Sequence, residues 1–181
     1  MKKQGLFIVG VLVAVLGVVG MGTVHAEDVV PDVLTDEQRA LIMNNCSDIQ
    51  TTLNRIYQND KLARHDLGLV YRSIVDKLMS PLNQRIASIQ LDGGSLVQVT
   101  ANYSAEYTVF FNAYRDYEQA LQAAMQTDCT KQPSMFYDAI TSARQKRAAV
   151  YESCKKLVGL AEAYYGQFTS FKASRGYGVK Q

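Results

Sequence analysis

The most constraining feature of this chain is the spacing of apolar and small residues between positions 134 and 173. The intervals alternate between three and four residues, except at the charged residue Arg147. This period of about 3.5 residues predicts one long helix that packs along a seam, as helices do in coiled coils. The helix needs neighbours, because its apolar stripe would otherwise face water. The stripe consists of Phe136, Ile140, Ala143, Val150, Cys154, Leu157, Ala161, Tyr164, Phe168 and Phe171.

Residues 35–91 carry a second seam of similar spacing. Thr35 and Gln38 have the spacing of a capping box at its start. Pro81 predicts a kink near Leu78, because proline removes a backbone donor and clashes with the preceding turn. The polar run at 58–61 is an alternative place for a true turn, so one kinked helix and two separate helices both remain possible. The predicted seam is Ile42, Cys46, Ile49, Leu53, Ile56, Asp60, Ala63, Leu67, Val70, Ile74, Leu78, Leu82, Ile86 and Ile89.

Residues 95–127 predict a third helix. Gly93 and Gly94 end the helix before it, and Ser95 is a suitable cap for its start. A turn at 128–133 follows, and the next helix would begin at Ser134. Because short connections force neighbouring helices to run in opposite directions, we expect an all-α fold. Residues 35–173 would form an antiparallel bundle of three to four long helices with coiled-coil-like seams.

The N-terminal segment has the pattern of an export signal. Two lysines, an apolar run and the sequence Val24-His25-Ala26 follow one another. This order predicts a secretory signal peptide over residues 1–26, cleaved between Ala26 and Glu27. The alternative is an uncleaved membrane anchor, since the uncharged run is about long enough to cross a bilayer. In both cases the rest of the chain is exported, so we expect a secreted or cell-envelope location.

Two short segments flank the predicted bundle. Residues 27–34 would be a linker, and residues 174–181 would be a flexible tail with little apolar surface to bury. Membrane contact is expected only through the N-terminal segment, and only if that segment is not cleaved.

Charge and residue types exclude several classes of function. Without Lys2 and Lys3, the basic and acidic residues balance, which argues against a nucleic-acid binder. Histidine occurs only at His25, inside the predicted signal, and at His65, so an imidazole metal site is not expected. Phosphate-binding glycine motifs are missing, and no serine or cysteine has an obvious base. We therefore expect no catalytic residue, no metal and no cofactor.

Three cysteines are present, at positions 46, 129 and 154. Export permits a disulfide, and the preferred pair is Cys46–Cys129, with Cys154 left as a free thiol on the helix seam. The alternatives are that all three are reduced, or that the third thiol links two chains. Straight helices would place Cys46 about 18 Å beyond the level of Cys129, so closing this bond requires a break or a shifted register.

Tyrosine is the one unusual component, with 11 residues and no tryptophan. One stripe on the third helix combines Tyr103, Tyr107, Phe110, Tyr114 and Tyr117. Its spacing matches the seam, which favours a structural core. The functional alternative is a surface for a glycan, a small apolar molecule or a partner, because each ring offers apolar area and a hydroxyl.

Two charged residues, Asp60 and Arg147, lie at seam positions. Either one would be costly to bury alone, so they would specify register or mark places where the seam is open to water. A count of helical rise from the turns does not place them at the same level. Asp76 lies nearer the level of Arg147 by this count.

Two short motifs carry a family resemblance. The sequences Cys46-Ser47-Asp48-Ile49-Gln50 and Asp128-Cys129-Thr130-Lys131-Gln132-Pro133 resemble those of a group of small exported helical proteins from bacteria with reduced genomes. The likeness covers most of residues 40–172. It implies export and a helical fold and no activity, and it supports the pairing of the two cysteines that the motifs contain.

These observations predict an exported, non-enzymatic helical bundle. It would act in a structural role or in protein–protein interaction at the cell envelope, either with an unknown partner or by self-association. The exposed faces of residues 35–58 would be the contact surface. The alternative is a ligand-binding bundle that uses the tyrosine stripe.

Overall fold

The computed structural model describes residues 34–176, and every regular element in this part of the chain is a helix. The predicted signal peptide with its cleavage point at Ala26 and Glu27, nearly all of the predicted linker and the last part of the predicted tail lie outside the described residues. The elements are α1 (Asp36–Asn44), α2 (Cys46–Ser73), the π-helix η1 (Ile74–Met79), α3 (Ser80–Ser88), α4 (Gly94–Gln126) and α5 (Pro133–Ser174). The prediction of an all-α fold is confirmed for this part.

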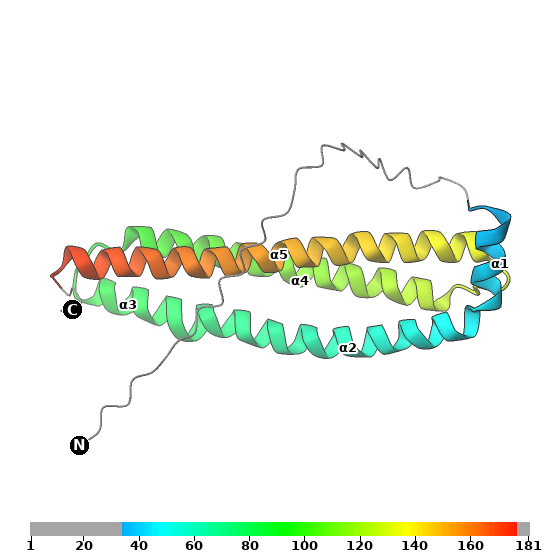
Figure 1. Cartoon of the computed structure of the whole chain (residues 1–181). Helices are drawn as coiled ribbons and strands as arrows, with labels where there is room; N and C mark the ends of the chain where they lie inside the picture. Colours follow the sequence, from blue (N-terminus) through cyan, green and yellow to red (C-terminus); the bar gives the residue numbers. More distant parts are fainter. Residues whose placement is uncertain (1–33, 177–181) are drawn as a thin grey trace, which may run out of the picture. The chain divides into compact units, whose positions relative to one another are not determined.

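The helices form one packed unit. The helices α2, η1 and α3 follow one another as a single rod, and α4 and α5 lie side by side along their length (Figure 1). The rod packs mainly on α4, while the short helix α1 contacts α5. The predicted boundaries near 92–95 and 128–134 agree with the structure to within three residues.

The first helix begins at the predicted capping box. The Thr35 side chain accepts a hydrogen bond from the Gln38 amide at 3.2 Å, and the Gln38 side chain accepts one from the Thr35 amide at 2.9 Å. The break that follows is at Asn45, whose side chain donates to the Leu41 carbonyl at 2.8 Å. Asparagine side chains compete in this way with the helical backbone. The alternative of a turn at 58–61 is wrong, because these residues lie inside α2.

The distortion expected near Leu78 takes the form of the π-helix η1. Pro81 has no amide hydrogen for the Lys77 carbonyl, four residues earlier. The preceding turns widen instead, and the Ser80 amide donates to the Val75 carbonyl, five residues back. The helix therefore continues through the proline with one extra residue in its turn.

The core combines one row from each long element. On α5 the buried apolar side chains are seven residues apart, at Phe136, Ala143, Val150, Leu157 and Tyr164, in agreement with the predicted seam. On α4 they include Leu96, Tyr103, Phe110, Tyr114, Tyr117 and Leu121. Leu53, Tyr71, Met79 and Ile86 complete the core from the rod.

The predicted seam of residues 35–91 is wrong in its middle part. Ala63, Leu67, Val70 and Leu78 are exposed, and Tyr71 and Met79 are buried instead. A straight helix drifts by about 20° per heptad relative to a strict seven-residue repeat, so the inward face moves to neighbouring positions. Tyr71 also packs edge-on against Phe110, with the ring centroids 5.2 Å apart, which favours that rotation of α2.

The predicted disulfide Cys46–Cys129 is present, with the Cα atoms 5.6 Å apart. The shifted register that this bond requires is present. Asp60 of α2 lies beside Tyr117 of α4, and Gln50 lies beside Thr127. The start of α2 is therefore level with the residues just after α4. Cys154 is free and half-buried, as expected.

Candidate functional site

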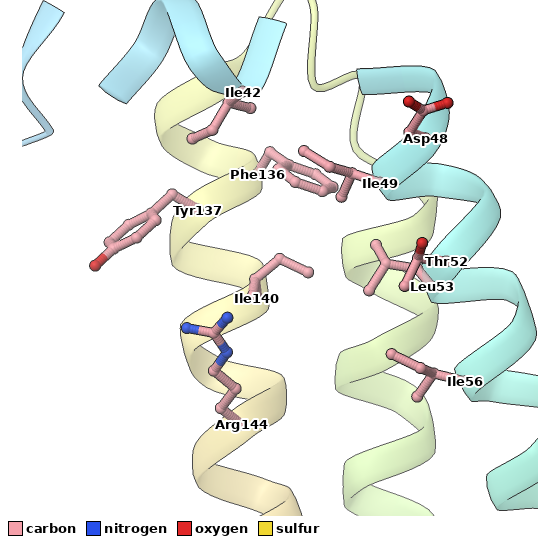
Figure 2. Close-up of a pocket in the computed structure, with 10 residues that line it drawn as sticks. All are labelled: Ile42, Asp48, Ile49, Thr52, Leu53, Ile56, Phe136, Tyr137, Ile140 and Arg144. Atoms are coloured by element: carbon pink, nitrogen blue, oxygen red, sulfur yellow. The ribbon is translucent and has the colours of Figure 1, made fainter. Parts of the chain in front are cut away.

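An apolar cleft opens between α2 and α5 at the end of the bundle that α1 covers. Figure 2 shows its two walls, with Ile49 and Leu53 on α2 facing Phe136 and Ile140 on α5. Its volume is about 440 Å³. The remaining lining residues are Ile42, Asp48, Thr52, Ile56, Tyr137 and Arg144.

The cleft exists because the start of α2 is held against α4. The disulfide joins Cys46 to Cys129, just after α4. One turn further on, the side-chain amide of Gln50 donates to the backbone carbonyl of Thr127 at 3.2 Å. These links leave the N-terminal turns of α2 and α5 apart, with apolar side chains on both walls.

The short helix α1 covers one end of the cleft, and a charged pair lies beyond the other end. At one end Ile42 of α1 lies above Phe136 (Figure 2). At the other end Arg147 of α5 pairs with Asp60 of α2 at 3.4 Å. A smaller cavity of about 150 Å³ shares Leu53, Ile56, Ile140 and Arg144 with the cleft and reaches Arg147.

The expectation that Asp60 and Arg147 lie at different levels is therefore wrong. Long side chains on a helix lean toward its N-terminus, which carries the Arg147 head group back by part of a turn. The count of helical rise also treated residues 89–91 as helix, whereas α3 ends at Ser88, and the observed register places Asp60 beside Tyr117. Asp76 pairs with Arg72, at 3.1 Å, and not with Arg147.

Asp60 is the centre of a polar cluster. The Tyr117 hydroxyl donates to its carboxylate at 2.5 Å, and the Tyr114 hydroxyl donates to its backbone carbonyl. Burial raises the pKa of Tyr117, and the hydrogen bond to Asp60 raises it further. Burial, followed by the charges of Asp60 and Glu118, raises the pKa of Tyr114 to about 12. Both hydroxyls therefore stay protonated and act as donors that hold α2 on α4.

The tyrosine stripe is largely core. Tyr103, Phe110, Tyr114 and Tyr117 are buried, and Tyr107 is half-buried. Those four rings are part of the bundle core. Tyr117 touches the smaller cavity, and Tyr107 and Phe110 border a separate cavity with Phe111. The stripe does not line the main cleft.

Replacement of tyrosine by phenylalanine should affect the free energy of unfolding in different ways at Tyr103 and Tyr117. We expect Tyr117→Phe to lower the free energy of unfolding by about 2 kcal/mol, because Asp60 loses a donor in a half-buried site. We expect Tyr103→Phe to be neutral or to raise it by up to about 1 kcal/mol, since the Tyr103 hydroxyl is buried without a partner among the described residues. Urea denaturation of both variants measures the difference. Equal losses in both would contradict it.

The sequence identified most residues of the cleft, but as seam and not as a cavity. Ile42, Ile49, Leu53, Ile56 and Ile140 were all assigned to a packed interface. One signal in the sequence could have indicated the cleft: both long seams carry more apolar residues than a single partner helix can cover. Asp48 and Arg144 lie outside the seams and had no sequence signal.

Within residues 34–176, no three potential metal ligands among histidine, cysteine, aspartate and glutamate gather together. None of the helices described has both the length and the apolar character that a membrane span requires.

Together, these features define a class of protein: an all-helical, disulfide-linked bundle with an apolar cleft on one side. No protein family model matches the chain, and neither a curated protein nor a solved structure shows significant similarity to it.

Proposed function

We propose that this chain is an exported, non-enzymatic helical bundle that binds a partner protein, or a second copy of itself, at the cell envelope. The observation that carries the proposal is an apolar row on α2 and η1 that heptad spacing assigns to an interface but that faces water. It consists of Ala63, Leu67, Val70 and Leu78. A seam with the spacing of helix packing and no cover within the described chain is a surface suited to another helix.

A second exposed row lies on α5, at Tyr151, Val158 and Tyr165, with intervals of seven residues. It continues the heptad position of Arg144, which lines the cleft. The α2 row likewise includes Ala63 and Val70, which follow Ile56 of the cleft wall at intervals of seven. Both rows thus extend the two walls of the cleft along the rest of their helices. A helix from outside could pack across them. They extend the interaction surface beyond residues 35–58, where the sequence alone places it.

The order of the contacts along the rod and α4 supports the antiparallel bundle on which this proposal is built. Gln50 reaches Thr127, Asp60 reaches Tyr117, and Asn83 reaches Thr100 at 2.8 Å. Residue numbers rise on the rod as they fall on α4. The predicted signal peptide supports export.

Light scattering with paired variants tests the interaction. We expect the wild type to form a single defined oligomer, and Val70→Glu/Val158→Glu to be monomeric, because two charges in the rows oppose apolar packing. The matched control is Val97→Glu/Val109→Glu on α4. Val97 and Val70 are both 54% exposed, and Val109 and Val158 are both 49% exposed. The two pairs of substitutions should therefore destabilise the folded state to a similar extent.

A heterologous partner is tested in the same positions. If the wild type is monomeric at high micromolar concentration, a photo-crosslinker at position 70 should form a discrete adduct in the envelope fraction, and one at position 97 should not. A monomer that gives no position-dependent adduct would refute the interaction function.

A second candidate function is ligand binding. The cleft favours it, because its volume lies within the range of about 300–1,000 Å³ typical of small-molecule sites, and its lining is mainly apolar. The ligand would enter between α2 and α5, away from the buried tyrosine rings.

A further inference from the structure

We infer that the cleft between α2 and α5 binds a single-chain fatty acid, with the carboxylate at Arg144 and the hydrocarbon chain directed toward Phe136. This inference rests on the ligand-binding candidate above and names its ligand class. Three properties of the cleft carry it: the polarity of its lining, its length and the placement of its charges.

The lining is apolar inside and polar only at the rim. Leu53 and Phe136 are buried, whereas Asp48, Thr52 and Arg144 are exposed at the edges. A sugar or a nucleotide would bury several hydroxyl or amide groups against these walls without hydrogen-bond partners, which is costly. A hydrocarbon chain has no such groups and gains free energy with each buried methylene.

The length of the cleft limits the length of the occupant. About eleven residues of α2, from Ile49 to Asp60, separate the α1 end from the Asp60–Arg147 pair, which is about 16 Å of helix. A partner helix confined to this length would be too short to be stable in water. The cleft therefore differs from the longer exposed rows, which suit a helix. A single extended hydrocarbon chain fits within it.

The charges give the ligand its sign and its direction. Arg144 has no carboxylate within ion-pair distance among residues 34–176, whereas Asp60 neutralises the nearby Arg147. Asp48 lies at the opposite, α1 end of the cleft, as Figure 2 shows. An anionic head group is attracted to Arg144 and repelled by Asp48. The two charges thus orient the head toward the middle of the bundle and the tail toward α1.

Calorimetric titration with decanoate, dodecanoate and dodecanol, below their micelle concentrations, tests the inference. We expect saturable binding with one site, and affinity rising about fourfold for each added methylene. Arg144→Gln should lower the affinity for dodecanoate by about tenfold and leave the affinity for dodecanol unchanged. Arg85→Gln is the matched control, because Arg85 is exposed on α3, away from the cleft.

A second pair of variants tests the location. Thr52→Trp places an indole at the mouth of the cleft and should abolish binding, while Thr51→Trp, at the adjacent exposed position of α2 outside the cleft, should not. Failure of all three probes to bind, equal binding in both tryptophan variants, or dodecanol binding as tightly as dodecanoate would overturn the inference.

Light scattering of the same proteins separates this result from the interaction function. If Thr52→Trp breaks an oligomer and no probe binds the wild type, the cleft is occupied by protein, and the fatty acid inference is overturned while the interaction function stands. If Val70→Glu/Val158→Glu has no effect on assembly and dodecanoate binds, the fatty acid inference stands and self-association through the rows is overturned.

Discussion

Loss of the Cys46–Cys129 disulfide is expected to lower the free energy of unfolding by about 4 kcal/mol. The bond joins residues that are 83 positions apart. Cross-linking so long a loop removes much of the conformational entropy of the unfolded chain. The same bond holds the start of α2 on α4, so its loss also frees α1 and one wall of the cleft. Urea denaturation of Cys46→Ala/Cys129→Ala, compared with oxidised wild type, measures the effect.

Cys154→Ala is the matched control, because this free thiol is half-buried and makes no cross-link. We expect it to cost about 1 kcal/mol or less. Wild type treated with a reductant should unfold like the double variant. The proposed entropic contribution of the bond would be refuted if the double variant were within about 1 kcal/mol of wild type and its unfolding free energy fell with urea concentration at the same slope (the m value).

Phe110→Ala is expected to lower the free energy of unfolding by a similar amount, about 4 kcal/mol. Phe110 is fully buried and lies at the centre of an aromatic cluster. Its ring contacts Tyr71 and Tyr114 edge-on, with centroids 5.2 and 5.8 Å away, and is stacked with Tyr107 at 6.4 Å. Truncation leaves a cavity between α2 and α4 that these large rings fill poorly.

Phe111→Ala provides the control for the same change at the next position, where the ring is 51% exposed. We expect a loss of about 0.5 kcal/mol there, since exposed side chains contribute little to stability. Thermal and urea unfolding of both variants would show the contrast. Comparable losses at the two positions would mean that the cluster does not organise the core.

The sequence predicted those features that depend on neighbours along the chain. The Thr35–Gln38 capping box requires only a side chain three residues from a backbone amide. The aromatic stripe of α4 and the seven-residue repeat of α5 follow from helical geometry, because residues spaced by three and four lie on one face. The pairing of Cys46 with Cys129 was also predicted, from the turn that surrounds Cys129.

The sequence failed where two helices determine each other. The break at Asn45 was missed because the polar run at 58–61 looked equally disruptive in isolation. Contacts from Asp60 to Tyr114 and Tyr117 keep α2 helical there. The rotation of α2, which exposes Val70 and buries Tyr71, depends on the ring of Phe110 on another helix.

The sequence by itself therefore determined that the described chain is helical and where its turns near 93 and 128–133 lie. Only the tertiary structure decided which face of α2 is buried, that Arg147 meets Asp60, and that α2 and α5 leave an apolar cleft between them. The physical reason is that periodicity defines an apolar stripe on one helix. The width and register of the space between two stripes depend on all the side chains that meet there, on the disulfide and on the turns.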